Sequence, residues 1–296
     1  MRAELLAALA ALCWAVGSVL SAHAAGRMGA FAFTRWRLFF ALTLLWAVAA
    51  WTGQWRDLDA AATGLLVLSG LVGIFIGDTA LFACMNRLGP RRCGILFATH
   101  AMFSALLAWP FLGETLWGWP LLGSGLLVSG VMVAVAWGRR ADENHQWEET
   151  RGRLAVGVAL GLLAAVGQAV ATLMLKPLMS TGVDPVAASA VRTTAAFVAH
   201  LALLWGGLRL AKVQEPLNAR VLISTWASAA VAMALGMTFI LAALRTGQAN
   251  LVGVMSSISP ILLLPLLWLI YRRRPALGAW FGSVMAIVGT AMILVG

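Results

Sequence analysis

Ten long apolar runs make up most of the sequence, and short segments rich in charged residues, glycine or proline separate them. About 20 consecutive apolar residues are enough for a helix to cross the hydrocarbon core of a bilayer. The pattern therefore predicts an all-α membrane protein with ten transmembrane helices. The predicted spans are residues 4–24, 29–51, 61–86, 92–112, 116–137, 154–175, 185–208, 221–245, 248–270 and 276–295.

The composition agrees with this pattern. Of the 296 residues, 61% are hydrophobic and 11% are charged, whereas soluble domains carry about 25% charged residues. The first run ends in a stretch, residues 21–26, that resembles a signal-peptide cleavage site. Because this run has a counterpart later in the chain, we expect it to remain as the first helix.

The net charge of +10 is distributed over the connections between the runs. Fourteen of the 21 lysines and arginines lie in the odd-numbered connections. This distribution is typical of the positive-inside rule and not of a nucleic-acid groove. We therefore expect membrane lipids and no nucleic acid as partners. The same rule predicts that the odd connections are cytoplasmic and that both termini are outside.

The two halves of the chain repeat the same features in the same order. The matching positions include Gly17 with Gly167, Gly77 with Gly236, Thr79 with Thr238, Gly89 with Gly247, Gly123 with Gly282, and Gly130 with Gly289. Five helices are an odd number, so the second copy must cross the bilayer inverted relative to the first. We predict two inverted five-helix repeats, residues 1–138 and 154–296, joined by a polar linker at 139–153. Such repeats are typical of transporters with a site near the midplane.

One stretch, FSALLAWPFLGETLWGWPLLGSGLLVSGVMV at residues 103–133, combines an apolar helix, Leu-Gly-Glu and glycines seven residues apart. It resembles the signature of the EamA domain in the drug/metabolite transporter superfamily. Residues 259–292 carry a weaker copy that lacks the Leu-Gly-Glu. The resemblance implies ten helices around a central cavity and alternating-access transport of amino acids, other small metabolites or drugs. Some members of the family have both termini in the cytoplasm, so the orientation stays open.

Asp78 is the one carboxylate inside the third predicted span, and His100 lies inside the fourth. Each is eleven residues from Gly89 in the turn between these spans. That distance is about 16 Å along a helix, near the middle of the roughly 30 Å core. A carboxylate there costs about 2.5–3.5 kcal/mol. We predict a substrate-binding or proton-coupling pair of Asp78 and His100; the alternative is a structural hydrogen bond between helices.

Other polar or aromatic residues near the middle of the spans are further candidates for substrate contact. They are Trp14, Gln168, Ser256, Ser257, Ser259 and Pro260. A proline frees a backbone carbonyl one turn before it, and Ser259-Pro260 resembles the proline of the family's ninth helix. A tryptophan can stack on an aromatic or cationic ligand. The alternatives are helix packing for the tryptophan and hydrogen bonding between helices for the serines.

Arginines also occur inside two of the spans, at Arg35, Arg37 and Arg192. We expect these side chains to extend to the lipid headgroups. The alternative is that one of them holds a substrate carboxylate in a bidentate contact. Glu114, in the turn after the fourth span, is expected to be a solvated loop charge.

The sequence contains no phosphate-binding loop, zinc motif or nucleophile elbow, and its three cysteines have no metal-binding spacing. We therefore expect no cofactor, no metal and no enzymatic activity. The predicted function is a secondary transporter that acts as a monomer and exports amino acids or related small metabolites across the inner membrane. The alternatives are an exporter of drugs or cationic compounds, a lipid flippase and a membrane-embedded enzyme.

Overall fold

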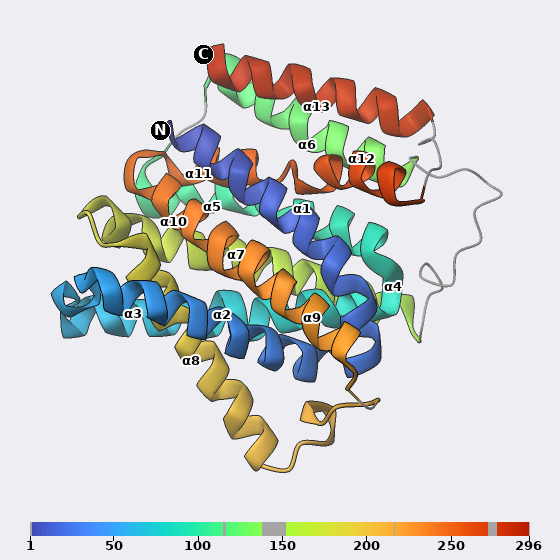
Figure 1. Cartoon of the computed structure of the whole chain (residues 1–296). Coiled ribbons are helices and arrows are strands. Elements are labelled where there is room, and N and C mark those ends of the chain that lie inside the picture. The colour runs from blue at the N-terminus through green and yellow to red at the C-terminus, as the bar shows by residue number, and fades with distance from the viewer. Residues whose placement is uncertain (1, 115–116, 138–151, 216, 272–276, 296) are drawn as a thin grey trace.

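The computed structural model describes residues 2–114, 117–137, 152–215, 217–271 and 277–295, and these segments are almost entirely helical (Figure 1). Most of the predicted linker, residues 139–151, lies outside the described residues. The first half contains α1 (Ala3–Met28), α2 (Ala30–Thr52), α3 (Ala60–Gly70), the π-helix η2 (Leu71–Asp78), α4 (Thr79–Ala98), α5 (His100–Leu112) and α6 (Trp119–Ala136). The second half contains α7 (Leu154–Ser180), α8 (Pro185–Trp205), α9 (Ala219–Ser228), the π-helix η5 (Ala229–Leu235), α10 (Gly236–Thr246), α11 (Ala249–Ser256), α12 (Ser259–Tyr271) and α13 (Leu277–Val295).

Seven of these helical stretches are long and apolar enough to cross a membrane. They are 3–28, 30–52, 60–89, 92–112, 154–180, 185–205 and 219–246, and they coincide with seven of the predicted spans. Shorter apolar helices, at 119–133, 249–263 and 280–289, lie at the other three predicted places. The chain is therefore a multi-pass, all-helical membrane protein in the part that the structure describes.

The predicted turn between the third and fourth spans is present at Gly89. Its backbone has φ 80° and ψ 161°, which interrupts α4. Glycine adopts this left-handed half of conformational space without a steric penalty, because it has no Cβ. The spans on either side, 60–89 and 92–112, are thereby separated.

Each half departs from regular α-helix at matching places. The π-helix η2 ends at Asp78 and η5 ends just before Gly236, so both adjoin the repeated Gly-x-Thr motif. The fourth helix of each half is also interrupted, between α4 and α5 at Thr99 and between α11 and α12 at Ser257. Both hydroxyls donate to a carbonyl three residues earlier, at 2.6 Å and 2.7 Å respectively. π-Bulges and broken membrane helices are frequently found at functional sites.

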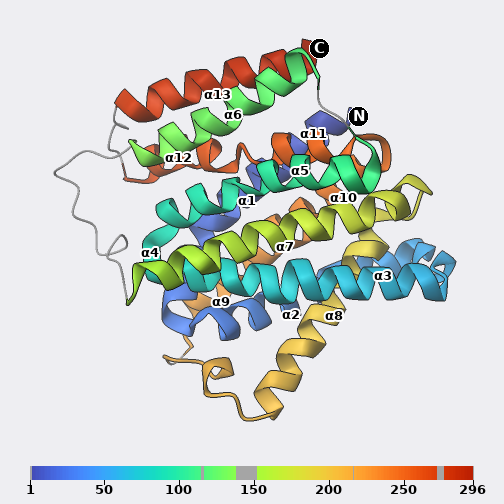
Figure 2. The same cartoon turned by 180° about the vertical axis from the view of Figure 1, so that it is seen from behind.

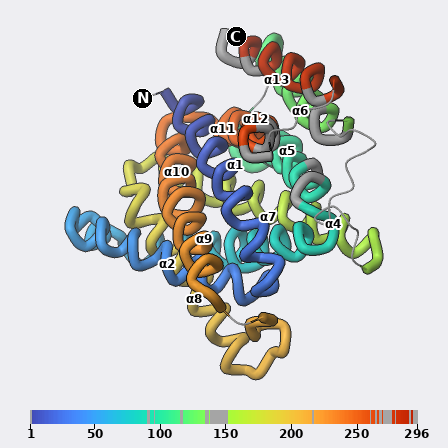
Figure 3. The backbone as a smooth tube through the Cα atoms, turned by 45° about the vertical axis from the view of Figure 1, so that its right-hand side comes forward, coloured from blue at the N-terminus to red at the C-terminus, as the bar shows by residue number. Residues whose placement is uncertain are grey.

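The first helix of each half packs against the third helix of the other half. In Figure 2, α7 lies along the helical stretch 60–89, which consists of α3, η2 and the first part of α4, and in Figure 3, α1 lies along α10. Gly17 of α1 contacts Ala232 of η5. At the corresponding position of α7, a Cβ on Gly167 would lie 3.1 Å from the Val72 carbonyl oxygen of η2. These glycines let the two halves approach closely.

The helices α6 and α13 pack closely side by side (Figures 1 and 2). A Cβ on Gly130 would lie 2.6 Å from the Gly282 carbonyl oxygen, and one on Gly289 would lie 2.5 Å from that of Gly123. The two glycine pairs that the sequence repeats therefore face each other across this contact. The two backbones lie so close together that only small residues fit between them.

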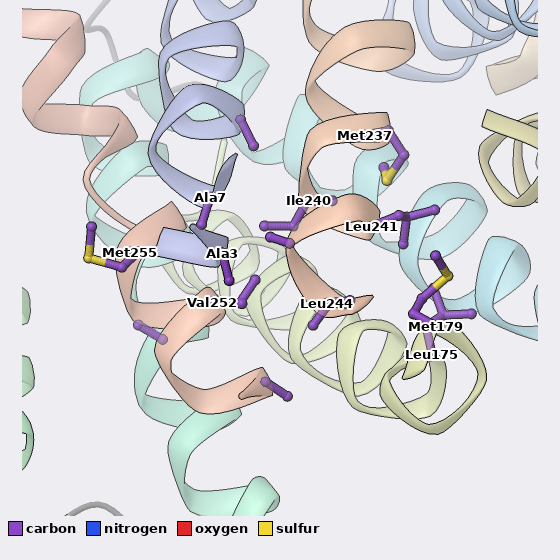
Figure 4. Close-up of a cluster of buried hydrophobic side chains, with 14 of the residues drawn as sticks. Ala3, Ala7, Leu175, Met179, Met237, Ile240, Leu241, Leu244, Val252 and Met255 are labelled. Atoms are coloured by element: carbon purple, nitrogen blue, oxygen red, sulfur yellow. The ribbon is translucent and has the colours of Figure 1, made fainter. Parts of the chain in front are cut away.

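The largest buried apolar cluster contains residues of helices from both halves (Figure 4). Ala3 and Ala7 of α1 lie near Ile240 and Leu244 of α10 and Val252 of α11. All of these side chains are nearly inaccessible to solvent. The cluster therefore packs α1 against the second half.

Candidate functional site

A cavity of about 90 Å³ lies between the two halves. The first half lines it with residues of α1, α2, η2 and α4, and the second half with residues of α7, η5, α10 and α12. Its polar lining comes mainly from Ser18, Ser21, Arg37, Asp78, Gln168 and Ser259. The remainder is aromatic or apolar, including Trp14, Phe82, Phe97, Met233 and Met237.

Asp78 accepts a hydrogen bond from Arg37 inside this cavity. Arg37 Nη1 lies 3.0 Å from Asp78 Oδ2, and the two side chains are only 7% and 15% exposed. The guanidinium carbon of Arg37 also lies 5.2 Å from the ring centroid of Phe82, in cation–π range. A buried arginine–carboxylate pair thus crosses from α2 to the end of η2.

The expectation that the arginines extend to lipid headgroups is wrong. Arg35, Arg37 and Arg192 are 7%, 6% and 2% exposed. They are buried because α2 and α8 pack against each other inside the bundle, so these faces do not meet lipid. Arg35 donates to the backbone carbonyl of Ala211 at 2.6 Å, away from the cavity lining.

Arg192 occupies in the second half the place that Arg37 has in the first. Its Nη1 lies 3.0 Å from the Met237 sulfur, and Met237 corresponds by the repeat to Asp78. Arg192 also lies close enough to Asp78 for an electrostatic interaction. Asp78 is therefore a carboxylate with two arginines around it.

Four of the residues predicted from the sequence lie together in the cavity lining: Trp14, Asp78, Gln168 and Ser259. His100 does not join them. It is 2% exposed and packs against Phe97, with ring centroids 5.1 Å apart. No hydrogen bond or ion pair between Asp78 and His100 occurs among the described residues. Asp78 and His100 each adjoin an interruption of regular α-helix. Their equal distance from Gly89 along the chain therefore does not make their side chains face each other. The roles assigned to these residues in transport stay predictions.

The serines at the end of α11 are directed into their own helix. Ser256 Oγ donates to the Gly253 carbonyl at 2.9 Å and Ser257 Oγ to the Val254 carbonyl at 2.7 Å. Both side chains are about 1% exposed and neither lines the cavity. Pro260 is in the first turn of α12, where proline fits a helix without loss of a hydrogen bond; its side chain lies outside the described residues.

Glu114 is not the solvated charge that we expected. Its two carboxylate oxygens accept hydrogen bonds from the backbone nitrogens of Ala249 and Asn250, at 2.9 Å and 3.0 Å. These groups open α11, so a carboxylate of the first half caps a helix of the second half. The favourable interaction of an anion with a helix N-terminus explains the contact.

A second buried polar contact lies next to the ion pair. Thr79 Oγ1 and His200 Nε2 are 3.1 Å apart, and the His200 ring makes T-shaped contacts with the rings of Phe31 and Phe75. The sequence interpretation missed this contact, and it also missed Arg37 as the partner of Asp78. The position of Arg37 inside an apolar run indicated that it needs a buried partner. The sequence does not show which helix faces it.

The sequence model of one family, described as the EamA-like transporter family, matches residues 1–136 and 155–295. A solved structure titled "Crystal structure of protein" is similar over 100% of this chain and 98% of that chain, with a TM-score of 0.77. The two sequences are 18% identical, so this likeness shows the fold alone. No protein of curated function matches the chain.

Proposed function

Since the chain belongs to the EamA-like transporter family, we propose that this membrane transporter is a secondary transporter for small metabolites, amino acids among them. We further propose that it exports them across the inner membrane. The observation that carries the proposal is the cavity that both halves line, with the Arg37–Asp78 pair inside it. A buried ion pair is costly in a membrane, and such groups mark substrate or ion pathways.

We propose that transport proceeds by alternating access between two inverted repeats of five spans each. The matching π-helices and the matching breaks in the fourth helices support this arrangement. So does the reciprocal packing of α1 and α7 on the opposite halves. A site at the boundary of two similar halves can open to either side when one half rocks against the other.

The size of the cavity supports a small solute. One water molecule needs at least about 10–15 Å³, and the cavity of about 90 Å³ exceeds this minimum several-fold, so it has room for a small solute. The two fused halves can form a complete pathway within one chain, and we therefore propose that the monomer transports.

A drug or cation exporter is the less supported transport function. Such a transporter would need a carboxylate free to bind the cation, but Asp78 is already paired with Arg37. A transporter for amino acids needs a cationic group that binds the carboxylate of the solute and an anionic group that binds its ammonium. It should therefore depend on the arginine as well as on the aspartate.

Counterflow in proteoliposomes tests the proposal. We expect exchange of at least one amino acid or related metabolite in a panel that also includes cationic dyes. Arg37→Lys should lower this exchange at least tenfold, because lysine keeps the charge but loses the planar fork that binds carboxylates.

The matched control is Arg27→Lys, since Arg27 pairs with Glu215 on the exposed surface. It should exchange solute at close to the wild-type rate. Exchange of dyes alone, unaffected by Arg37→Lys, would contradict the metabolite assignment. The absence of exchange for every solute and dye in the panel would contradict the transport function.

A further inference from the structure

The buried charges around the cavity do not balance. Arg37 and Arg192 are 6% and 2% exposed, and arginine stays protonated in proteins. Asp78 is the carboxylate that forms an ion pair with Arg37, and no described carboxylate forms an ion pair with Arg192. The three groups together carry a net charge of +1. An uncompensated charge is expensive inside a membrane protein.

Both arginines also have hydrogen-bonding capacity to spare. The Nε atoms of Arg37 and Arg192 are buried and make no hydrogen bond with any described residue. A buried donor without a partner carries its full desolvation penalty. Arg37 lines the cavity directly, and Met237, which contacts Arg192, lines it as well.

The repeat shows which group the second arginine lacks. In the first half, Arg37 Nη1 lies 3.0 Å from the carboxylate of Asp78, between Gly77 and Thr79. In the second half, Arg192 Nη1 lies 3.0 Å from Met237, between Gly236 and Thr238. A thioether sulfur is only a weak acceptor and bears no charge. The Arg192 side of the cavity therefore has a cation without the counter-charge that its counterpart has.

We propose that the transported solute has a net charge of −1, and that its carboxylate binds on the Met237 side of the cavity, where it balances Arg192. This inference rests on the transport function proposed above. An acidic amino acid fits, with its ammonium toward Asp78 and its two carboxylates toward the two arginines. A small oxo or hydroxy acid also fits, with the Arg37–Asp78 pair left intact. A net-neutral amino acid leaves the charge of +1 unbalanced, and a cation increases it.

Ligand-induced thermal stabilisation of the purified protein in detergent tests the charge preference. Two pairs of nearly isosteric probes differ mainly by one charge: aspartate with asparagine, and 4-methylpentanoate with 4-methylpentanamide. A ligand that binds the native state raises Tm in proportion to the logarithm of its concentration over Kd. We expect the acid of at least one pair to bind at least tenfold more tightly than its amide. Amides that bind as well as the acids, or no stabilisation by either acid, would overturn the inference. Equal stabilisation by chloride would overturn the assignment of a carboxylate.

A substitution at Met237 tests whether the carboxylate of the solute binds near Arg192. Met237→Asp gives Arg192 the carboxylate that Arg37 already has, so the preference for the acid over the amide should fall at least tenfold. Met237→Asn has nearly the same shape without the charge and should retain the preference, whatever its absolute affinity. If both variants retained the preference, or both lost it, the solute charge would not be balanced at Arg192. Monodisperse elution of both proteins in detergent shows that they are folded.

Counterflow of the same four probes separates this inference from the transport function. Exchange of asparagine or of the amide without a preference for the acids would overturn the inference and leave transport standing. Stabilisation by the acids with no exchange of any solute would retain the charge assignment and overturn transport.

Discussion

Replacing Asp78 with asparagine is expected to lower the free energy of unfolding by about 3–5 kcal/mol, the cost of removing one partner from a buried charge pair. The cost is high because Asp78 serves two buried arginines. Arg37 pairs with it at 3.0 Å, and Arg192 interacts with it electrostatically. Asparagine keeps the shape and leaves both cations without a carboxylate. Thermal or denaturant unfolding in detergent micelles measures the effect.

Removing the arginine of the pair should lower the free energy of unfolding less than removing the aspartate. In Arg37→Met, Asp78 still has Arg192 nearby, so the remaining charges balance. The exposed pair of Arg27 and Glu215 provides a matched control, because its side chains are 33% and 52% exposed. Glu215→Gln should cost less than about 1 kcal/mol, as surface ion pairs contribute little. Equal losses in Asp78→Asn and Glu215→Gln would contradict the role of the buried pair.

Gly130→Ala is expected to destabilise the protein by about 1–3 kcal/mol, the usual cost of overpacking a close contact. The new Cβ would lie 2.6 Å from backbone atoms of Gly282 and Ala286, which cannot rotate away as a side chain can. The helices α6 and α13 would have to separate.

Gly125→Ala, on the same helix, is the control for this prediction. A Cβ there meets nothing within 4 Å. It should be neutral or stabilise the helix by up to about 1 kcal/mol, because alanine has the higher helix propensity. A loss at Gly130 no larger than the change at Gly125 would show that the α6–α13 contact tolerates a wider separation.

The sequence was sufficient for the arrangement of helices along the chain. Apolar runs of about 20 residues predict spans because backbone polar groups in lipid must be satisfied within a helix. The turn at Gly89 and the glycine pairs of α6 and α13 follow from residue identity and spacing. The turn depends on the backbone of one residue, and the glycine pairs depend on the spacing of residues along one helix face, so neither requires knowledge of the tertiary packing.

The partners across the cavity could not be predicted in this way. Placing Asp78 opposite His100 assumed straight helices, but η2 ends at Asp78 and a break directly precedes His100. Arg37 lies seven residues into α2, about 10 Å along the helix axis. Its depth was visible in the sequence, but its burial depends on the packing of α2 against α8.

Ser256 and Ser257 illustrate a different limit. Near the middle of an apolar run, a serine that faces a cavity and a serine that donates to its own helix look the same. In the structure both hydroxyls satisfy carbonyls next to the break between α11 and α12. Ser259, two residues further along, is the one that lines the cavity.

Alternating access is tested by measuring whether the cavity can be reached from each side of the membrane. Ser18 lines the cavity and is partly exposed, so Ser18→Cys is made in a protein whose three native cysteines are replaced by alanine. A membrane-impermeant thiol reagent is added to either side of oriented vesicles. We expect the cysteine to react from both sides, and a transported solute should slow the reaction in each case. Reaction from one side only, or from neither, would contradict a cavity that opens alternately to both.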